Sequence, residues 1–134
     1  MSIRVLIADG AKIVRDAIRR LLNGQREIEI VGEAADFAQA IGMIEELKPQ
    51  IVILDLYMPI GSESSLDDVR DQVRSSGVQV LAISIYLDET TQELAKAIGA
   101  PFFVDKMKLG HELIPAVKTL ASRSSEEQPG LKQE

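Results

Sequence analysis

Short apolar runs rich in β-branched residues alternate along the chain with longer segments in which apolar residues recur at helical spacing. Each run has the length of one strand and contains at most one polar or charged residue instead of a regular alternation, which is typical of strands buried on both faces of a parallel sheet. The runs are residues 3–8, 28–32, 51–54, 78–83 and 101–104. We therefore expect five parallel strands with helices between them.

The intervening segments predict five helices. Their apolar stripes lie within residues 13–22, 37–47, 66–73, 88–98 and 109–121. Asp36 and Asp88 are placed to cap the starts of the second and fourth helices, and Gly24, Gly77 and Gly99 stand where the first, third and fourth helices end. This alternation predicts the α/β class, a doubly wound (βα)5 sandwich with helices on both faces of the sheet.

The length of 134 residues fits one domain. We expect that domain to span residues 1–121, because the composition from Ser122 onward offers too few apolar groups to pack. Residues 122–134 are expected to form a flexible tail or an interdomain linker.

The composition excludes several kinds of protein. The chain has no cysteine and a single histidine, His111, so thiolate metal sites, disulfides and multi-histidine metal sites are excluded. We interpret His111 as an ordinary residue at the start of a helix. The net charge of −6 and the pI of about 4.9 argue against direct nucleic-acid binding. Without a membrane-length apolar run or a signal-peptide profile, we expect a cytoplasmic protein with no membrane contact.

Polar residues follow four of the five runs, where the carboxyl ends of parallel strands meet at one edge of the sheet. They are Asp9 after the first run, Asp55 after the third, Ser84 after the fourth and Asp105–Lys106 after the fifth. The second run ends at Glu33, where we see no chemically distinctive group. Taken singly, each of these residues is an ordinary cap or turn residue. Together they predict two carboxylates, a hydroxyl and an ammonium at one site.

Such a site suits phosphoryl chemistry. A carboxylate can attack a phosphoryl group and form an aspartyl phosphate. Two carboxylates can hold Mg²⁺ together with waters and phosphate oxygens. An ammonium offsets the negative charge of the phosphoryl oxygens, and a hydroxyl can hydrogen-bond the group once it is in place.

These residues resemble those of the response regulator receiver domain of bacterial two-component systems, a CheY-like family. The resemblance covers roughly residues 3–121, and its most specific motif is Ile53-Leu54-Asp55-Leu56-Tyr57-Met58-Pro59. Residues 4–9, Ser84 and Lys106 also match the family pattern. Residues 14–22 and 31–34 resemble most the LuxR/NarL-type subfamily, whose receivers precede a helix-turn-helix output domain. The resemblance implies the strand order 2-1-3-4-5 of flavodoxin-like folds.

The resemblance also implies roles for individual residues. Asp55 would accept the phosphoryl group, with Lys106 paired to it and Ser84 as the switch hydroxyl. Asp9, Asp55 and the backbone carbonyl of Tyr57 would hold Mg²⁺. The implied partners are a sensor histidine kinase or phosphotransfer protein, an output domain or regulatory target, and a second copy in a homodimer. A receiver domain is not an enzyme beyond catalysing its own phosphoryl transfer and dephosphorylation.

The chain departs from the family pattern at three places. Gly10 replaces the usual second acidic residue, so we expect Mg²⁺ to bind weakly. Phe103 stands where a switch tyrosine is common, after Phe102, and can turn inward without donating a hydroxyl hydrogen bond. Glu63 replaces a usual glycine. These departures leave an alternative open: a pseudo-receiver that works as a phosphorylation-independent interaction module.

Other interpretations fit less well. A phosphatase of the haloacid dehalogenase type needs an aspartate where Tyr57 stands, a flavodoxin-type carrier needs a hydroxyl-rich loop after the first strand, and a cobalamin domain needs a histidine in a loop. The first helix also gathers basic residues. These are Lys12, Arg15, Arg19 and Arg20, with Arg26 after the helix. They form either a solvated helix face or a docking surface for an acidic partner.

Overall fold

The computed structural model describes residues 2–59, 61 and 66–126. The departure at Glu63 and residues 127–134 of the expected tail lie outside this part of the chain.

One parallel sheet of five strands forms the centre of the fold, in the order β2-β1-β3-β4-β5. The strands are β1 (Ile3–Ala8), β2 (Ile28–Ala34), β3 (Ile51–Asp55), β4 (Gln79–Ser84) and β5 (Phe103–Asp105). This order confirms the one that the family resemblance implied. Because β1 and β3 are neighbours, their carboxyl ends lie side by side, with Ala8 opposite Leu54.

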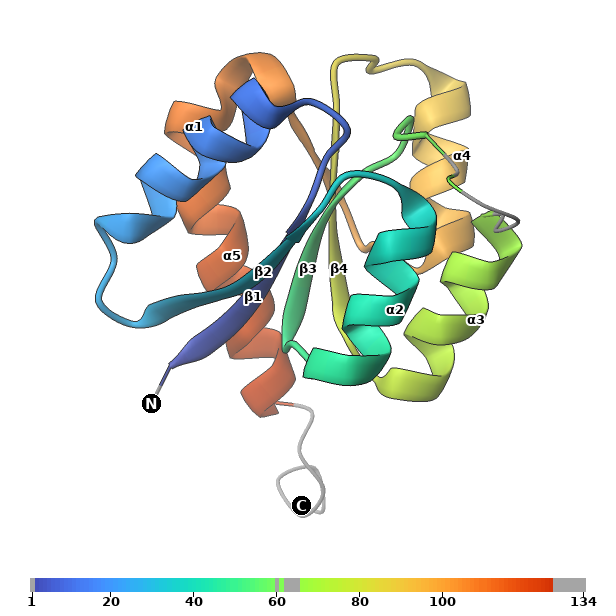
Figure 1. The fold of residues 1–134 in the computed structure, drawn as a ribbon. Coiled ribbons are helices and arrows are strands. Elements are labelled where there is room, and N and C mark those ends of the chain that lie inside the picture. Colours follow the sequence, from blue (N-terminus) through green and yellow to red (C-terminus); the bar gives the residue numbers. More distant parts are fainter. Residues whose placement is uncertain (1, 60, 62–65, 127–134) are drawn as a thin grey trace.

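Helices cover both faces of the sheet (Figure 1). They are α1 (Lys12–Asn23), α2 (Phe37–Leu47), α3 (Leu66–Ser76), α4 (Glu89–Ile98) and α5 (Leu109–Glu126), with the 3-10 turn η1 (Lys106–Lys108) before α5. Helices α1 and α5 cover one face, and α2, α3 and α4 cover the other (Figure 1). The predicted doubly wound α/β architecture is therefore confirmed.

Each face of the sheet has its own apolar core, and β1 shows why its sequence is continuously apolar from Val5 to Ala8. Leu6 and Ala8 are buried in the core beneath α2, α3 and α4, whereas Val5 and Ile7 are buried in the core beneath α1 and α5. Successive strand side chains point to opposite faces, so a strand covered on both sides has no solvent-facing position to fill with a polar residue.

Several element bounds differ from those expected. Strand β2 continues to Ala34, because its pairing with β1 runs on to Ala8 opposite Ala34. Strand β5 is Phe103–Asp105 instead of residues 101–104, because only these residues pair with β4. Helix α5 continues past Ala121 to Glu126, since residues 122–126 contain no glycine or proline to end it.

The predicted helix starts at Asp36 and Asp88 are confirmed. Asp36 accepts a hydrogen bond from the Gln39 amide, and Asp88 accepts one from the Thr91 amide. Such side-chain caps satisfy amides that have no partner within the helix. Among the described residues, no helix combines the length and the apolar character needed to cross a membrane.

Candidate functional site

Asp9, Asp55 and Lys106 meet at the carboxyl edge of the sheet, as the sequence predicted. Asp9 follows β1 and Asp55 ends β3, and both are buried, at 1% and 7% exposure. Lys106 follows β5, and its Nζ lies 2.7 Å from Asp9 Oδ2 and 3.2 Å from Asp55 Oδ2. A single ammonium therefore bridges two buried carboxylates that come from neighbouring strands.

Hydrogen bonds from backbone amides fix the orientation of the two carboxylates. Asp9 Oδ1 accepts a hydrogen bond from the Ala11 amide at 2.9 Å, and Asp55 Oδ1 accepts one from the Tyr57 amide at 3.0 Å. Each aspartate thus presents its second oxygen to Lys106. Asp9 Oδ2 is buried and faces the charge of Lys106 without the alignment of a hydrogen bond, so its capacity to accept is not used up.

Ser84 is close in the sheet but is not held against Asp55. It ends β4, one residue beyond Ile83, the register partner of Asp55, and it is buried at 1% exposure. Its Oγ accepts a hydrogen bond from the Tyr86 amide at 2.9 Å. The loop after β4 therefore engages the hydroxyl oxygen, while the hydroxyl hydrogen is left to rotate.

A chain of hydroxyl contacts links the segment after Asp55 to the start of α4, and no sequence pattern pointed to it beyond the Asp88 cap. The Tyr57 hydroxyl lies 2.8 Å from Thr91 Oγ1, and Thr91 Oγ1 donates to Asp88 Oδ1 at 2.8 Å. Thr91 is fully buried. The hydrogen bonds from the Thr91 hydroxyl and amide lower the pKa of Asp88 below its usual value. The Tyr57 ring also meets the Tyr86 ring edge-on, with the centroids 5.1 Å apart.

Phe103 lies apart from the carboxylates. It is half-buried in β5 and, with Ala95 and Lys96 of α4, lines a cavity of about 270 Å³. This is the α4 side of the sheet, where Phe103 packs against the core. Its predicted role as a switch residue stays a prediction.

Gly10 leaves the pocket with two carboxylates. Among the described residues, no group of three or more acidic, histidine or cysteine side chains is placed to hold a metal ion. A Cβ added at Gly10 would lie 2.8 Å from Pro59 Cδ, so any larger residue there requires a small movement of Pro59. The glycine at position 10 thus has two consequences: Pro59 can approach its backbone closely, and this position gives the pocket no third carboxylate.

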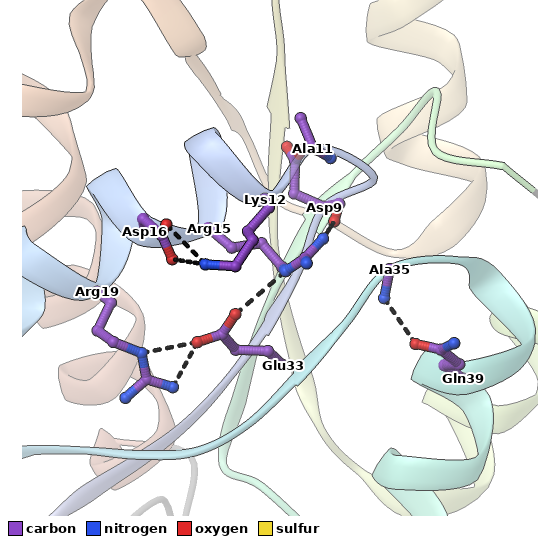
Figure 2. A network of polar contacts seen from close by, with 9 residues as sticks. All are labelled: Asp9, Ala11, Lys12, Arg15, Asp16, Arg19, Glu33, Ala35 and Gln39. Carbon is purple, nitrogen blue, oxygen red and sulfur yellow. Dashed lines mark hydrogen bonds and ion pairs between the residues drawn. The ribbon is translucent and has the colours of Figure 1, made fainter.

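Glu33, in which the sequence showed nothing distinctive, is the centre of an ion-pair network (Figure 2). Its Oε1 accepts from Arg15 Nε at 3.1 Å, and its Oε2 accepts from Arg19 Nε at 2.7 Å. Arg15 Nη1 also donates to the main-chain oxygen of Asp9 at 2.7 Å. The signal was available in the sequence, since residues four apart on a helix share a face. What was missing was the register that sets β2 beside that face.

This network changes the interpretation of the basic first helix. Arg15 and Arg19 are paired with Glu33, and Lys12 pairs with Asp16 at 3.0 Å. Two carboxylates, Glu33 and Asp16, therefore offset part of the positive charge of this helix, which weakens the hypothesis of a docking surface for an acidic partner.

An open parallel sheet with a lysine across two buried aspartates at its carboxyl edge is the architecture of the receiver class of signalling domains. Residues 5–118 match the family model described as response regulator receiver domain. The chain therefore belongs to this family, whose members act in two-component signalling, interact with histidine kinases and output domains, and generally bind Mg²⁺ at the phosphorylation site.

Relatives of two kinds are similar to this chain. The protein-glutamate methylesterase/protein-glutamine glutaminase of Pyrococcus abyssi is 34% identical over 107 residues, covering 78% of this chain and 28% of that protein. The transcriptional regulatory protein DegU of Brevibacillus brevis is 29% identical over 121 residues, covering 90% of this chain and 50% of that protein. The chain thus spans half or less of the length of these two relatives, and the methylesterase name describes a protein of which most lies outside the match.

Solved structures agree with the fold and with the subfamily. A LuxR-family two-component response regulator from Aurantimonas sp. SI85-9A1 has a TM-score of 0.79 and 27% identity, covering 91% of this chain and 87% of that one. The non-phosphorylated receiver domain of RcsB from Escherichia coli has a TM-score of 0.81 at 20% identity, covering 92% and 95%. The predicted kinship with LuxR/NarL-type regulators is confirmed.

Proposed function

We propose that Asp55 accepts a phosphoryl group from a phosphohistidine of a sensor histidine kinase or phosphotransfer protein. A carboxylate oxygen of Asp55 attacks phosphorus, the bond between phosphorus and the histidine nitrogen breaks, and the imidazole leaves with the electron pair of that bond. The product is an aspartyl phosphate, which changes the surface that the chain offers to an output domain, a regulatory target or a second copy of itself.

The contact of Lys106 with both Asp9 and Asp55 is the observation that carries this proposal. An ammonium 3.2 Å from the attacking carboxylate offsets the charge of the incoming phosphoryl oxygens without having to be moved into place. Burial strengthens that interaction, because the pocket has a lower dielectric constant than water.

The residues present fit a magnesium ion, with fewer protein ligands than the family usually supplies. Asp9 and Asp55 would hold it together with the Tyr57 carbonyl, and water would fill the place of a carboxylate at Gly10, because Mg²⁺ readily keeps waters. The unused acceptor capacity of Asp9 Oδ2 supports this assignment. When bound, the ion would supply positive charge that offsets the negative charge of the carboxylates and of the phosphoryl group.

The switch begins at Ser84 in this proposal. A phosphoryl group on Asp55 offers new acceptors for the Ser84 hydroxyl, whose oxygen now accepts from the Tyr86 amide. Moving Ser84 toward the phosphoryl group therefore disturbs the loop that leads into α4. Phe103, beside α4, has no hydroxyl group, so it responds to this movement only through a change in packing.

Intact-mass analysis after incubation with acetyl phosphate tests the phosphoryl acceptor. We expect a Mg²⁺-dependent phosphoryl adduct in the native chain and none in Asp55→Asn, which retains the size of the side chain but not its charge. Equal labelling of both proteins would exclude Asp55 as the acceptor.

The second candidate is a phosphorylation-independent interaction module. The observation that favours it is the position of exposed apolar side chains around the pocket. They are Ile13, Tyr57, Ile85, Tyr86, Leu87 and Met107. Such a concentration suits contact with a protein partner. The same experiment decides, because this function predicts no adduct in a folded chain under conditions that label an ordinary receiver.

The division of the chain is part of the proposal. We assign the receiver domain to residues 1–121 and a tail or interdomain linker to residues 122–134, the first part of which continues helix α5 to Glu126. The family match over residues 5–118 supports this boundary.

A further inference from the structure

We propose that Arg15 is a positioning residue for the acidic pocket: it holds the main chain at Asp9 so that the Asp9 carboxylate faces Lys106 and a bound divalent cation. This inference rests on the proposed function of the pocket. It adds a residue that lies outside the pocket and supports that function.

Arg15 braces the end of β1 against β2. From the first turns of α1 its Nη1 donates to the Asp9 carbonyl at 2.7 Å, and its Nε donates to Glu33 Oε1 at 3.1 Å. The guanidinium thus lies between the two strands that form one side of the site (Figure 2). Its side chain is only 15% exposed, so water competes poorly for either contact.

The turn that Arg15 holds is restrained at its start by the backbone hydrogen bond from the Asp9 amide to the Ala34 carbonyl at 3.0 Å, but it has few side-chain restraints. Gly10 adds no side chain, and Ala11 at the start of α1 has no side chain able to cap the helix. The Asp9 carboxylate accepts a hydrogen bond from the amide of Ala11 itself at 2.9 Å, which ties the Asp9 side chain to this turn. The orientation of the Asp9 carboxylate therefore depends on the backbone geometry of this turn. Arg15 is the side chain that holds the Asp9 carbonyl within the turn.

Arg19 provides a matched control. It pairs with the same Glu33, through Oε2 at 2.7 Å, but among the contacts of the described residues it does not reach Asp9. Removing either arginine costs one positive charge and one ion pair with Glu33. Only the removal of Arg15 also frees the Asp9 carbonyl.

The direction in which Mg²⁺ affinity changes when Arg15 is removed shows whether Arg15 acts by positioning Asp9 or only through its charge. Losing a positive charge near the pocket favours a cation and tightens Mg²⁺ binding. Losing the brace weakens binding, because partners that orient metal ligands typically contribute about 10–100-fold in affinity. We expect Arg15→Ala to raise the Kd for Mg²⁺ about tenfold, and Arg19→Ala to leave it unchanged or slightly lower it.

The test combines a Mg²⁺ titration with amide hydrogen exchange of the metal-free chain in chelator. In Arg15→Ala the Ala11 amide should exchange about fivefold faster, because its acceptor on Asp9 is no longer held, and in Arg19→Ala it should exchange as in the native chain. Arg15→Lys, which can reach the carbonyl or Glu33 but does not bridge them as a planar fork does, should fall between. It replaces Arg15→Ala if that variant does not fold.

Two results would overturn the proposal. One is an equal effect of Arg15→Ala and Arg19→Ala on both Mg²⁺ affinity and Ala11 exchange, and the other is tighter Mg²⁺ binding in Arg15→Ala. If the native chain binds no Mg²⁺, the metal part of the proposed function fails. The exchange experiment then decides alone: faster exchange in Arg15→Ala and not in Arg19→Ala supports positioning, and equal exchange contradicts it.

Discussion

The two sides of the pocket are held by different kinds of interaction. On the β1–α1 side, charged groups fix the backbone: Arg15 joins Glu33 to the Asp9 carbonyl, and Lys106 joins Asp9 to Asp55. On the β4–α4 side, neutral hydroxyls make the links, with Tyr57 bound to Thr91 and Ser84 bound to the Tyr86 amide.

The buried charged groups of the first side also differ in exposure from the loop after β4 on the second side, although Ser84 and Thr91 on that second side are buried too. Asp9 is buried and Arg15 nearly so, whereas Ile85, Tyr86 and Leu87 are each more than half exposed. Charge-assisted contacts are about twice as strong as neutral ones. We infer that the β1–α1 side keeps the reacting carboxylates in place, while the β4–α4 side is the part that can rearrange and that a partner can contact.

The strongest test of this comparison removes the ammonium that joins the carboxylates. Lys106→Met leaves Asp9 and Asp55 buried without their cation, so we expect a loss of about 3 kcal/mol in the free energy of unfolding in chelator. Adding Mg²⁺ should restore part of that loss, because the ion replaces the missing charge. Urea denaturation with and without Mg²⁺ measures both effects.

Lys108→Met is the control for this prediction, since Lys108 is exposed in the same 3-10 turn. It should change stability by less than about 0.5 kcal/mol. Similar losses in the two variants would show that the bridge to the carboxylates contributes little.

On the β4–α4 side the expected effects are smaller. Thr91→Val removes a buried hydroxyl that contacts both Tyr57 and Asp88, and should cost about 2 kcal/mol. Tyr57→Phe removes only one of these contacts and should cost about 1 kcal/mol. Urea denaturation of both variants and of the double variant gives the coupling between them, and full additivity would mean that the Tyr57–Thr91 contact carries no stability.

The third prediction concerns Gly10. Gly10→Asp should tighten Mg²⁺ binding about tenfold by adding a carboxylate, and should cost about 1 kcal/mol of stability because its Cβ must displace Pro59. Gly10→Ala should show the same stability cost with no gain in affinity. Titration and thermal unfolding measure the two effects, and an affinity gain in both variants would point to movement of Pro59 as the cause.

The smallest effect is a pH dependence at the start of α4. The Thr91 hydroxyl and amide lower the pKa of Asp88, so its contribution to stability is present above the ordinary value of 3.8 and is lost as the pH falls through the lowered value. In Asp88→Asn, the midpoint temperature of thermal unfolding should fall less steeply than in the native chain as the pH is lowered below 3.8. An identical acid profile would show that the Asp88 charge does not act on stability.

The sequence went far in predicting this molecule because local patterns carry most of its architecture. Continuously apolar strands such as residues 51–54 require cover on both faces, and the Asp36 and Asp88 caps are recognised within four residues. The convergence of Asp9, Asp55 and Lys106 followed from one rule, that parallel strands end at a common edge. That rule did not predict the distances between these residues, or that a single ammonium, that of Lys106, bridges the two carboxylates.

Which groups meet across elements depends on how the whole domain packs. Glu33 looked unremarkable until the pairing of β1 with β2 brought it beside Arg15 and Arg19, and Thr91 looked like any helix residue until the loop after Asp55 placed Tyr57 against it. Local sequence patterns determine the elements and the edge at which they end, since periodicity and capping act over a few residues. The brace at Arg15 and the hydroxyl links at Tyr57 depend on strand register and side-chain reach between segments far apart in the chain, and these are set only when the whole domain packs.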